Sequence, residues 1–256
     1  MAGGGTPAVT RERIPSFRQA IARLTYEAQM VVSQHPLVAL PIARARGHGV
    51  VAGPDTEIVI EGFPRSANAF AVAAFARAQR PHRARIAHHV HAPAQVLAAV
   101  RRGIPALVLI RRPEDCVLEY ALKKREVTLG QALRGYARFY APLLPHRSGF
   151  VIGLFDDVVT DFGAVLRRIN ERFGATFHVF EHTEENVRAC LEEIDAYWRD
   201  RMGAGEALEV TVNRPSEVRD RMKDALRPAY LAGPLVEGRA RAERLYEAFA
   251  RAARQV

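Results

Sequence analysis

The spacing of apolar and polar residues predicts a helical N-terminal part followed by a regular alternation of strands and helices. The first helix is predicted at residues 17–32. Its apolar residues recur at helical spacing: Phe17, Ile21, Leu24 and Ala28. A β-branched run at 57–61 predicts a strand. The almost wholly apolar run at 105–111 predicts a strand that is covered on both faces.

Further strands are predicted at 85–91 and 150–155. Further helices are predicted at 68–80, 93–102, 113–124, 129–144, 158–173, 184–202, 217–226 and 238–253. Strands that alternate with helices through short connections imply a parallel sheet, so the chain is predicted to be a three-layer α/β/α protein with extra C-terminal helices. One domain is predicted from 13 to 256, after a disordered N-terminus at 1–12.

The net charge of +9 suggests a polyanionic ligand. The excess is arginine spread along the chain, without a recognised nucleic-acid module, so a phosphorylated small molecule is favoured over nucleic acid. Ordinary solvated arginine is the alternative for much of this charge. With two cysteines, no signal-peptide pattern and an apolar run at 31–42 that is too short to span a bilayer, a cytoplasmic protein is predicted.

The turn after the strand at 57–61 has the features of a phosphate-binding loop. Gly62 and Pro64 shape the turn, and the first N–H groups of the next helix, from Ser66 onward, suit an anion. Arg65 adds a guanidinium that can form a forked pair with anionic oxygens. The phosphate-binding string G-x-x-x-x-G-K-[ST] is absent. The alternative is a capped helix that simply follows a strand.

This loop resembles the first motif of the sulfotransferases that use 3′-phosphoadenosine 5′-phosphosulfate (PAPS), roughly P-[KR]-S-G-T-T-W after a strand. Three positions match directly: Pro64, Arg65 and Ser66. Four positions depart from the motif: Ala67, Asn68, Ala69 and Phe70. The resemblance implies that residues 64–69 cradle the 5′-phosphosulfate, with Arg65 stabilising charge on the leaving nucleotide.

A histidine segment matches the family's second motif, roughly K-x-H-x-P, near the end of the next strand. His91 falls on the position of the catalytic histidine, and His89 falls where lysine is common. The resemblance implies that His91 is the general base for the acceptor hydroxyl, a role that suits the pKa of histidine. A zinc site with His88 and His89 and a purely structural role are the alternatives.

The third motif, R-x-P-x-D-x-x-x-S, follows the apolar strand at 105–111. Arg111, Pro113 and Asp115 match it, which implies that Arg111 holds the 3′-phosphate. Glu119 stands in the place of the serine, where a carboxylate would repel a phosphate. We expect Glu119 to point outward and to pair with Lys123 four residues later on the same helix.

A fourth segment, residues 154–174, resembles the family's strand and helix that follow. The family's C-terminal R-K-G loop is absent, and Arg214 and Arg219 are the candidates for its contact with the 3′-phosphate.

The resemblance implies a PAPS-dependent sulfotransferase that needs no metal and acts on a small-molecule, carbohydrate or lipid acceptor. Two alternatives remain open. One is a P-loop kinase-like phosphotransferase, against which the missing lysine of the loop counts. The other is a catalytically degenerate sulfotransferase fold that binds a nucleotide or a partner protein. The sequence indicates neither the acceptor nor the oligomeric state.

Overall fold

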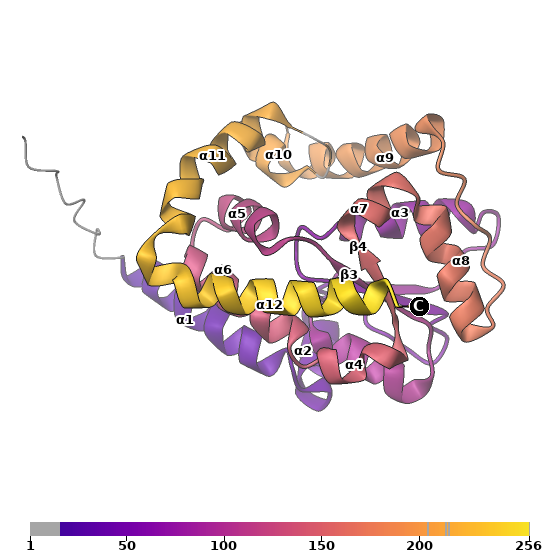
Figure 1. Cartoon of the computed structure of the whole chain (residues 1–256). Helices are drawn as coiled ribbons and strands as arrows, with labels where there is room; N and C mark the ends of the chain where they lie inside the picture. The colour runs from indigo at the N-terminus through magenta and orange to yellow at the C-terminus, as the bar shows by residue number, and fades with distance from the viewer. Residues whose placement is uncertain (1–15, 204, 213, 215, 256) are drawn as a thin grey trace, which may run out of the picture.

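The computed structural model describes residues 16–203, 205–212, 214 and 216–255. The predicted disordered segment at 1–12 lies outside these residues, and the prediction of one domain from 13 to 256 stays a prediction. The described chain contains a parallel sheet of four strands in the order β2-β1-β3-β4. The strands are β1 (Ile58–Gly62), β2 (Ile86–His88), β3 (Ala106–Ile110) and β4 (Val151–Leu154). The predicted α/β architecture with a central parallel sheet is therefore confirmed (Figure 1).

Two hydrophobic clusters cover the two faces of the sheet. Neighbouring residues of β1 divide between them, because successive strand residues point to opposite faces: Val59 belongs to one cluster and Ile60 to the other. Every residue of β1 and β3 is buried, as expected for strands with helices on both sides.

Three layers of secondary structure follow from these clusters (Figure 1). The first face is covered by α1 (Phe17–Val32), α4 (Pro93–Arg102), α5 (Pro113–Lys123), α6 (Leu129–Tyr140) and α12 (Val236–Ala253). The second face is covered by α3 (Asn68–Ala78), α7 (Phe155–Thr160), α8 (Phe162–Phe173) and α9 (Glu184–Met202). The remaining α-helices are α2 (Pro36–Arg46), α10 (Glu206–Thr211) and α11 (Glu217–Leu231).

The structure differs from the predicted elements where local backbone geometry interrupts a pattern. The strand predicted at 85–91 ends at His88, because His89 and His91 have positive φ angles of 58° and 52°. The helix predicted at 158–173 is divided at Asp161, whose side chain caps α8 by accepting a hydrogen bond from the N–H of Ala164 at 2.9 Å.

The strand order places a topological switch point at the carboxyl ends of β1 and β3. From β1 the chain crosses to β2 on one side and then returns to β3 on the other. Ligands of open α/β sheets bind in the crevice at such a point. The segments that carry Arg65 and Arg111 leave these two strands at that edge. Within the described chain, no helix has the length and apolar character to cross a bilayer.

Candidate active site at the carboxyl edge of the sheet

The loop between β1 and α3 has a strained backbone. Arg65 and Ala67 adopt positive φ angles of 74° and 68°, which L-residues with a side chain rarely adopt. The side-chain amide of Asn68 donates a 3.0 Å hydrogen bond to the carbonyl of Phe63 and so closes the loop. Such strain costs about 1–3 kcal/mol per residue and is concentrated at functional sites in proteins.

Ser66 anchors this loop from the inside. Its buried hydroxyl lies 3.2 Å from the Sγ atom of Cys116 in α5 and 3.3 Å from the hydroxyl of Tyr140 in α6. The Tyr140 hydroxyl donates to the carbonyl of Leu109 at 2.7 Å and accepts from the N–H of Phe63 at 3.2 Å. The loop is thereby fixed to β3, α5 and α6. The other two residues of the predicted cradle are partly exposed: Pro64 and Ala69.

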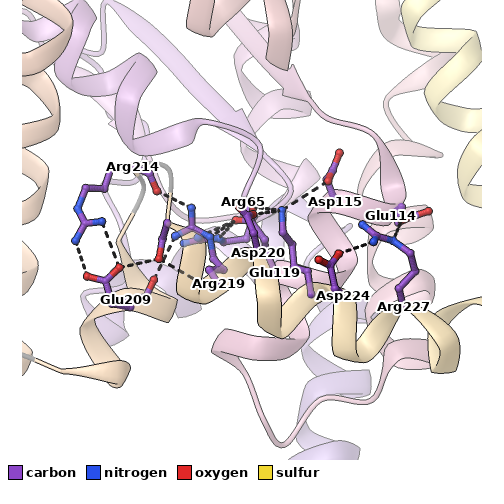
Figure 2. A network of polar contacts seen from close by, with 12 residues as sticks. Arg65, Glu114, Asp115, Glu119, Glu209, Arg214, Arg219, Asp220, Asp224 and Arg227 are labelled. Carbon is purple, nitrogen blue, oxygen red and sulfur yellow. Dashed lines mark hydrogen bonds and ion pairs between the residues drawn. The ribbon is translucent and has the colours of Figure 1, made fainter.

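A buried carboxylate, Glu119, is surrounded by cationic side chains beside this loop (Figure 2). It is only 3% exposed. It accepts hydrogen bonds from Nε of Arg65 at 2.9 Å and from Nη1 of Arg111 at 3.0 Å. Nε of Arg219 and Nζ of Lys223 lie 3.5 Å and 3.6 Å from its oxygens. The three arginines come from the loop after β1, the end of β3 and helix α11, so tertiary folding creates this cluster.

The expectation that Glu119 points outward to Lys123 is wrong. The guanidinium groups of Arg65 and Arg111 hold the carboxylate inside, and Lys123 instead lies over the ring of Trp198 at 4.4 Å. Burial alone would raise the pKa of Glu119, but the surrounding cations outweigh it and lower the pKa to about 2. Glu119 is therefore ionised at neutral pH and serves as the internal counter-ion of the arginines.

Arg65 also contacts the C-terminal part of the chain. Its Nη1 and Nη2 atoms donate to the carbonyl oxygens of Thr211 and Val212, both at 3.0 Å. Nη1 of Arg219 donates to the Val212 carbonyl at 2.8 Å. The guanidinium of Arg111 lies 4.0 Å above the ring of Phe155. The end of α10 thus covers the guanidinium of Arg65.

The two C-terminal arginines proposed from the sequence have different positions. Arg219 is buried in the cluster with Arg65 and Glu119. Arg214 instead pairs with Asp195 at 2.7 Å and with Glu209 at 2.5 Å, at the other end of the network in Figure 2. The structure therefore brings Arg65, Arg111 and Arg219 together around one carboxylate, and the backbone carbonyl of Arg214 accepts a hydrogen bond from Nη2 of Arg219.

The histidine loop between β2 and α4 is fixed by a second buried carboxylate, Glu61 of β1. Glu61 accepts hydrogen bonds from the N–H groups of Val90 at 2.8 Å and His91 at 3.1 Å. The side-chain amide of Gln95 donates to it at 2.9 Å. Nδ1 of His91 lies 2.9 Å from the carbonyl oxygen of Gly62 and 3.9 Å from Oε2 of Glu61.

This geometry determines the proton position on His91. A nitrogen that faces a carbonyl must donate, so Nδ1 carries the proton and Nε2 keeps a lone pair. Burial lowers the pKa of His91 to about 4, so the ring is neutral at pH 7. Burial also raises the pKa of Glu61 to about 8, although its N–H donors favour the ionised form. The role of Glu61 is not evident from the sequence, where its one signal is an acidic residue in an otherwise apolar strand.

The charge of Lys123 interacts with both the arginine cluster and the histidines. Burial, together with the charge of Arg65, lowers the pKa of Lys123 to about 8. Its charge in turn contributes to the lowered pKa values of His89 and His91. In the part of the chain that the structure describes, no group of three or more His, Cys, Asp or Glu residues could hold a metal ion. His82 pairs with Glu57 at 3.1 Å instead of joining the histidine loop.

Matches to known proteins are found among solved structures. No protein-family model matches the chain, and no curated protein matches it. Among solved structures, the chain is similar to mouse sulfotransferase SULT7A1, which was crystallised in complex with PAP. The two share 10% identity over 76% of this chain and 90% of that chain, with a TM-score of 0.38. The assignment of site residues therefore rests on the geometry described above.

Proposed function

We propose that this chain binds PAPS and transfers its sulfuryl group to an acceptor hydroxyl. The observation that supports this most directly is the convergence of Arg65, Arg111 and Arg219 on one buried carboxylate at the switch point of the sheet. Guanidinium groups recognise phosphate and sulfate oxygens as they recognise carboxylates. In this proposal the carboxylate of Glu119 lies where a phosphate or sulfate group of the nucleotide would bind the same guanidinium groups.

The charge around the cluster fits an anionic ligand. The positive charge of Lys223 is partly neutralised by Asp220 at 2.8 Å and Asp115 at 3.9 Å. The three arginines share the single negative charge of Glu119, so their net charge stays positive. At the start of α3, the first N–H groups have no acceptor within the helix and favour a phosphate. Residues 64–69 are proposed to hold the 5′-phosphosulfate, and Arg111 with Arg219 the 3′-phosphate.

When bound, PAPS would supply the sulfuryl group and a phosphate leaving group. Nε2 of His91 would accept the proton of the acceptor hydroxyl, while the bond from Nδ1 to the Gly62 carbonyl keeps the ring oriented. The guanidinium of Arg65 would stabilise negative charge on the leaving nucleotide. These roles require neither a covalent enzyme intermediate nor a metal. The acceptor is proposed to be a small molecule, carbohydrate or lipid, in the cytoplasm.

A second candidate function is nucleotide binding without turnover. The observation that favours it is that Arg65 already contacts Glu119 and the carbonyls of Thr211 and Val212. A ligand must exchange with these partners before it reaches the guanidinium. A turnover assay with labelled PAPS and mixed phenol, sugar and lipid acceptors distinguishes the two functions. A phosphotransferase would instead consume ATP and depend on magnesium.

Adenosine 3′,5′-bisphosphate is expected to stabilise the protein more than AMP or ATP does. A ligand that binds only the folded state at 100 times its Kd raises the free energy of unfolding by about 2.7 kcal/mol. Because only the bisphosphate places anionic groups on both sides of the ribose, it alone can reach residues 64–69 and Arg111 together. A thermal-shift series at equal concentrations tests this. A shift with AMP as large as that with the bisphosphate would contradict the assignment of the nucleotide.

Replacement of Glu61 by glutamine is expected to change the pH dependence of turnover. Ionised Glu61, 3.9 Å from Nδ1, would make His91 a stronger base. Since burial raises the pKa of Glu61 to about 8, wild-type kcat/KM is expected to rise as the pH increases through 8. The Glu61→Gln variant should lack this rise while its bisphosphate affinity stays the same. An unchanged pH profile would assign Glu61 a structural role only.

A further inference from the structure

Helix α1 exposes its apolar side to solvent. Four large apolar side chains follow the spacing i, i+4, i+7 and i+14 and are extensively exposed: Phe17 at 81%, Ile21 at 48%, Leu24 at 71% and Val31 at 46%. Ala28, at i+11, is exposed as well. These five residues, called the α1 stripe below, repeat with the alternating spacing of four and three that is characteristic of coiled-coil seams.

The opposite side of α1 is the side that packs on the protein. Tyr26 is buried there, and Glu27 forms ion pairs with Arg134 and Arg138 of α6. The side-chain amide of Gln131 donates to the carbonyl of Arg23 at 3.0 Å. In Figure 1, α1 lies at the periphery of the molecule beside α6. The helix therefore makes its intramolecular contacts through the side that carries Tyr26, and among the residues that the structure describes the α1 stripe stays exposed.

The exposed area is large enough for a specific interface. The α1 stripe exposes roughly 400 Å² of apolar surface, which is already the scale of the largest patch on an ordinary monomer. Helix α2 follows after a short turn and exposes three more large apolar residues: Leu37 at 90%, Val38 at 48% and Ile42 at 38%. An interface that extended onto α2 would include roughly 300 Å² more, which would bring the total close to the ~800 Å² per partner of a standard interface.

We propose that the α1 stripe is a homodimerisation surface, on which α1 of a second copy packs antiparallel about a two-fold axis. Leu24 lies at the centre of the stripe, so the axis places it against its symmetry mate. Phe17 then lies opposite Val31, and Ile21 lies opposite Ala28. A large side chain thus faces a smaller one at every off-centre position, as close packing requires.

The charge of the surface favours a second copy over other occupants. Arg18 is the exposed charged residue of α1, and its other exposed polar residues are neutral: Gln19, Thr25 and Gln29. Two chains of net charge +9 repel each other, and this surface, with Arg18 as its one exposed charge in α1, contributes little to that repulsion. A helix that binds anionic membranes would instead carry rows of lysine and arginine beside its apolar side.

The sequence of residues 1–15 has too little apolar character for this segment to cover the α1 stripe. Their large apolar side chains are Met1, Val9 and Ile14, too few to cover the stripe and the exposed residues of α2. A second copy supplies an equal apolar surface by symmetry. This inference is independent of the proposed enzymatic function, because α1 carries none of the residues assigned to the site.

The test is sedimentation equilibrium of the full chain across a wide range of concentration. The wild type is expected to dimerise, and Leu24→Glu to weaken self-association by at least about 100-fold, since two carboxylates would meet at the axis. Gln29→Glu adds the same charge on the same helix away from the stripe and should leave the dimer intact. Circular dichroism confirms folding, because both positions are exposed and outside the core.

A cysteine cross-link tests the antiparallel arrangement. Both native cysteines are buried, so Leu24→Cys introduces an accessible thiol. Under mild oxidation this variant is expected to form a disulfide dimer, and Phe17→Cys is expected not to, because symmetry-related Phe17 residues lie at opposite ends of the interface. A monomeric wild type overturns the proposal. So does equal cross-linking of both variants, or a monomer that binds phosphatidylcholine–phosphatidylserine vesicles through the stripe.

Discussion

Replacement of Glu119 by glutamine is expected to destabilise the ligand-free protein and to increase its affinity for adenosine 3′,5′-bisphosphate. Removal of one partner from a buried ion cluster costs about 3–5 kcal/mol, because the remaining charges lose their compensation. For a domain of this size, that loss lowers the Tm by about 10 °C. The same change removes the carboxylate that competes with an anionic ligand for Arg65, Arg111 and Arg219. We expect a gain in affinity of about tenfold or more, or at least about 1.4 kcal/mol.

Calorimetric titration and thermal unfolding measure the two effects together. Glu114→Gln is the matched control, because Glu114 lies on the same helix and pairs with Arg227 at the surface. This control should change stability by less than about 1 kcal/mol and leave the affinity unaltered. If Glu119→Gln binds the bisphosphate within threefold of the wild type, the carboxylate does not occupy the position of a nucleotide anion. Recovery of the Tm by added sulfate would support an anion site even without nucleotide specificity.

The stability contributed by Glu119 also depends on pH. Its pKa falls from 4.5 to about 2 on folding, so the unfolded chain binds more protons between these values. The contribution is present above pH 4.5 and is lost as the pH falls towards 2. The destabilising effect of Glu119→Gln should therefore be seen at neutral pH and diminish in acid.

Much of the fold could be predicted because local signals mark the ends of its elements. The predicted limits of α1, α4 and α9 agree with the structure. In α4 these signals are Pro93 in the first turn and Gly103 in the left-handed conformation after the last residue. Helix α2 has the same signals, with Pro36 at its start and Gly47 at its end, but the proline inside it concealed the helical pattern.

Only those residues of the candidate site that come directly after the ends of strands could be predicted from the sequence. Arg65 and Arg111 leave adjacent parallel strands at the same edge of the sheet, so their proximity follows from topology. Glu119 and Arg219 are 100 residues apart in the sequence, and their contact depends on the packing of α11 against α5. An acidic residue on a helix is usually solvated, and no local pattern signals that three arginines from other elements will surround it.

The orientation of α1 illustrates the same limit. Helical spacing predicts that an apolar stripe exists, and an amphipathic helix ordinarily turns such a stripe towards its own core. Here Arg134 and Arg138 of α6 form ion pairs with Glu27 of α1, which lies outside the stripe. Ion pairs and the burial of Tyr26 thus set an orientation that the hydrophobic pattern alone would not predict.

Replacement of His91 by alanine is expected to lower turnover by about 100-fold or more while leaving bisphosphate affinity within about twofold. That is the usual contribution of a positioned general base. Its pKa of about 4 keeps the ring ready to accept a proton at pH 7, and activity should fall as the pH is lowered through 4. The affinity is expected to persist because the ring contacts Gly62 and Glu61 rather than any of the three arginines.

Two controls separate a catalytic role of His91 from a structural one. His82→Ala removes a largely exposed ring that pairs with Glu57 outside the site, and it should retain full activity. Added imidazole should restore part of the activity of His91→Ala, because a soluble base can enter the space that the side chain leaves. Full activity of His91→Ala would assign proton transfer to another group, for which Lys123, with a pKa lowered to about 8, is a candidate. Loss of nucleotide affinity together with turnover would instead show that the histidine loop supports the arginine cluster. In that case the histidine loop would act through Glu61, whose carboxylate accepts hydrogen bonds from the N–H groups of Val90 and His91.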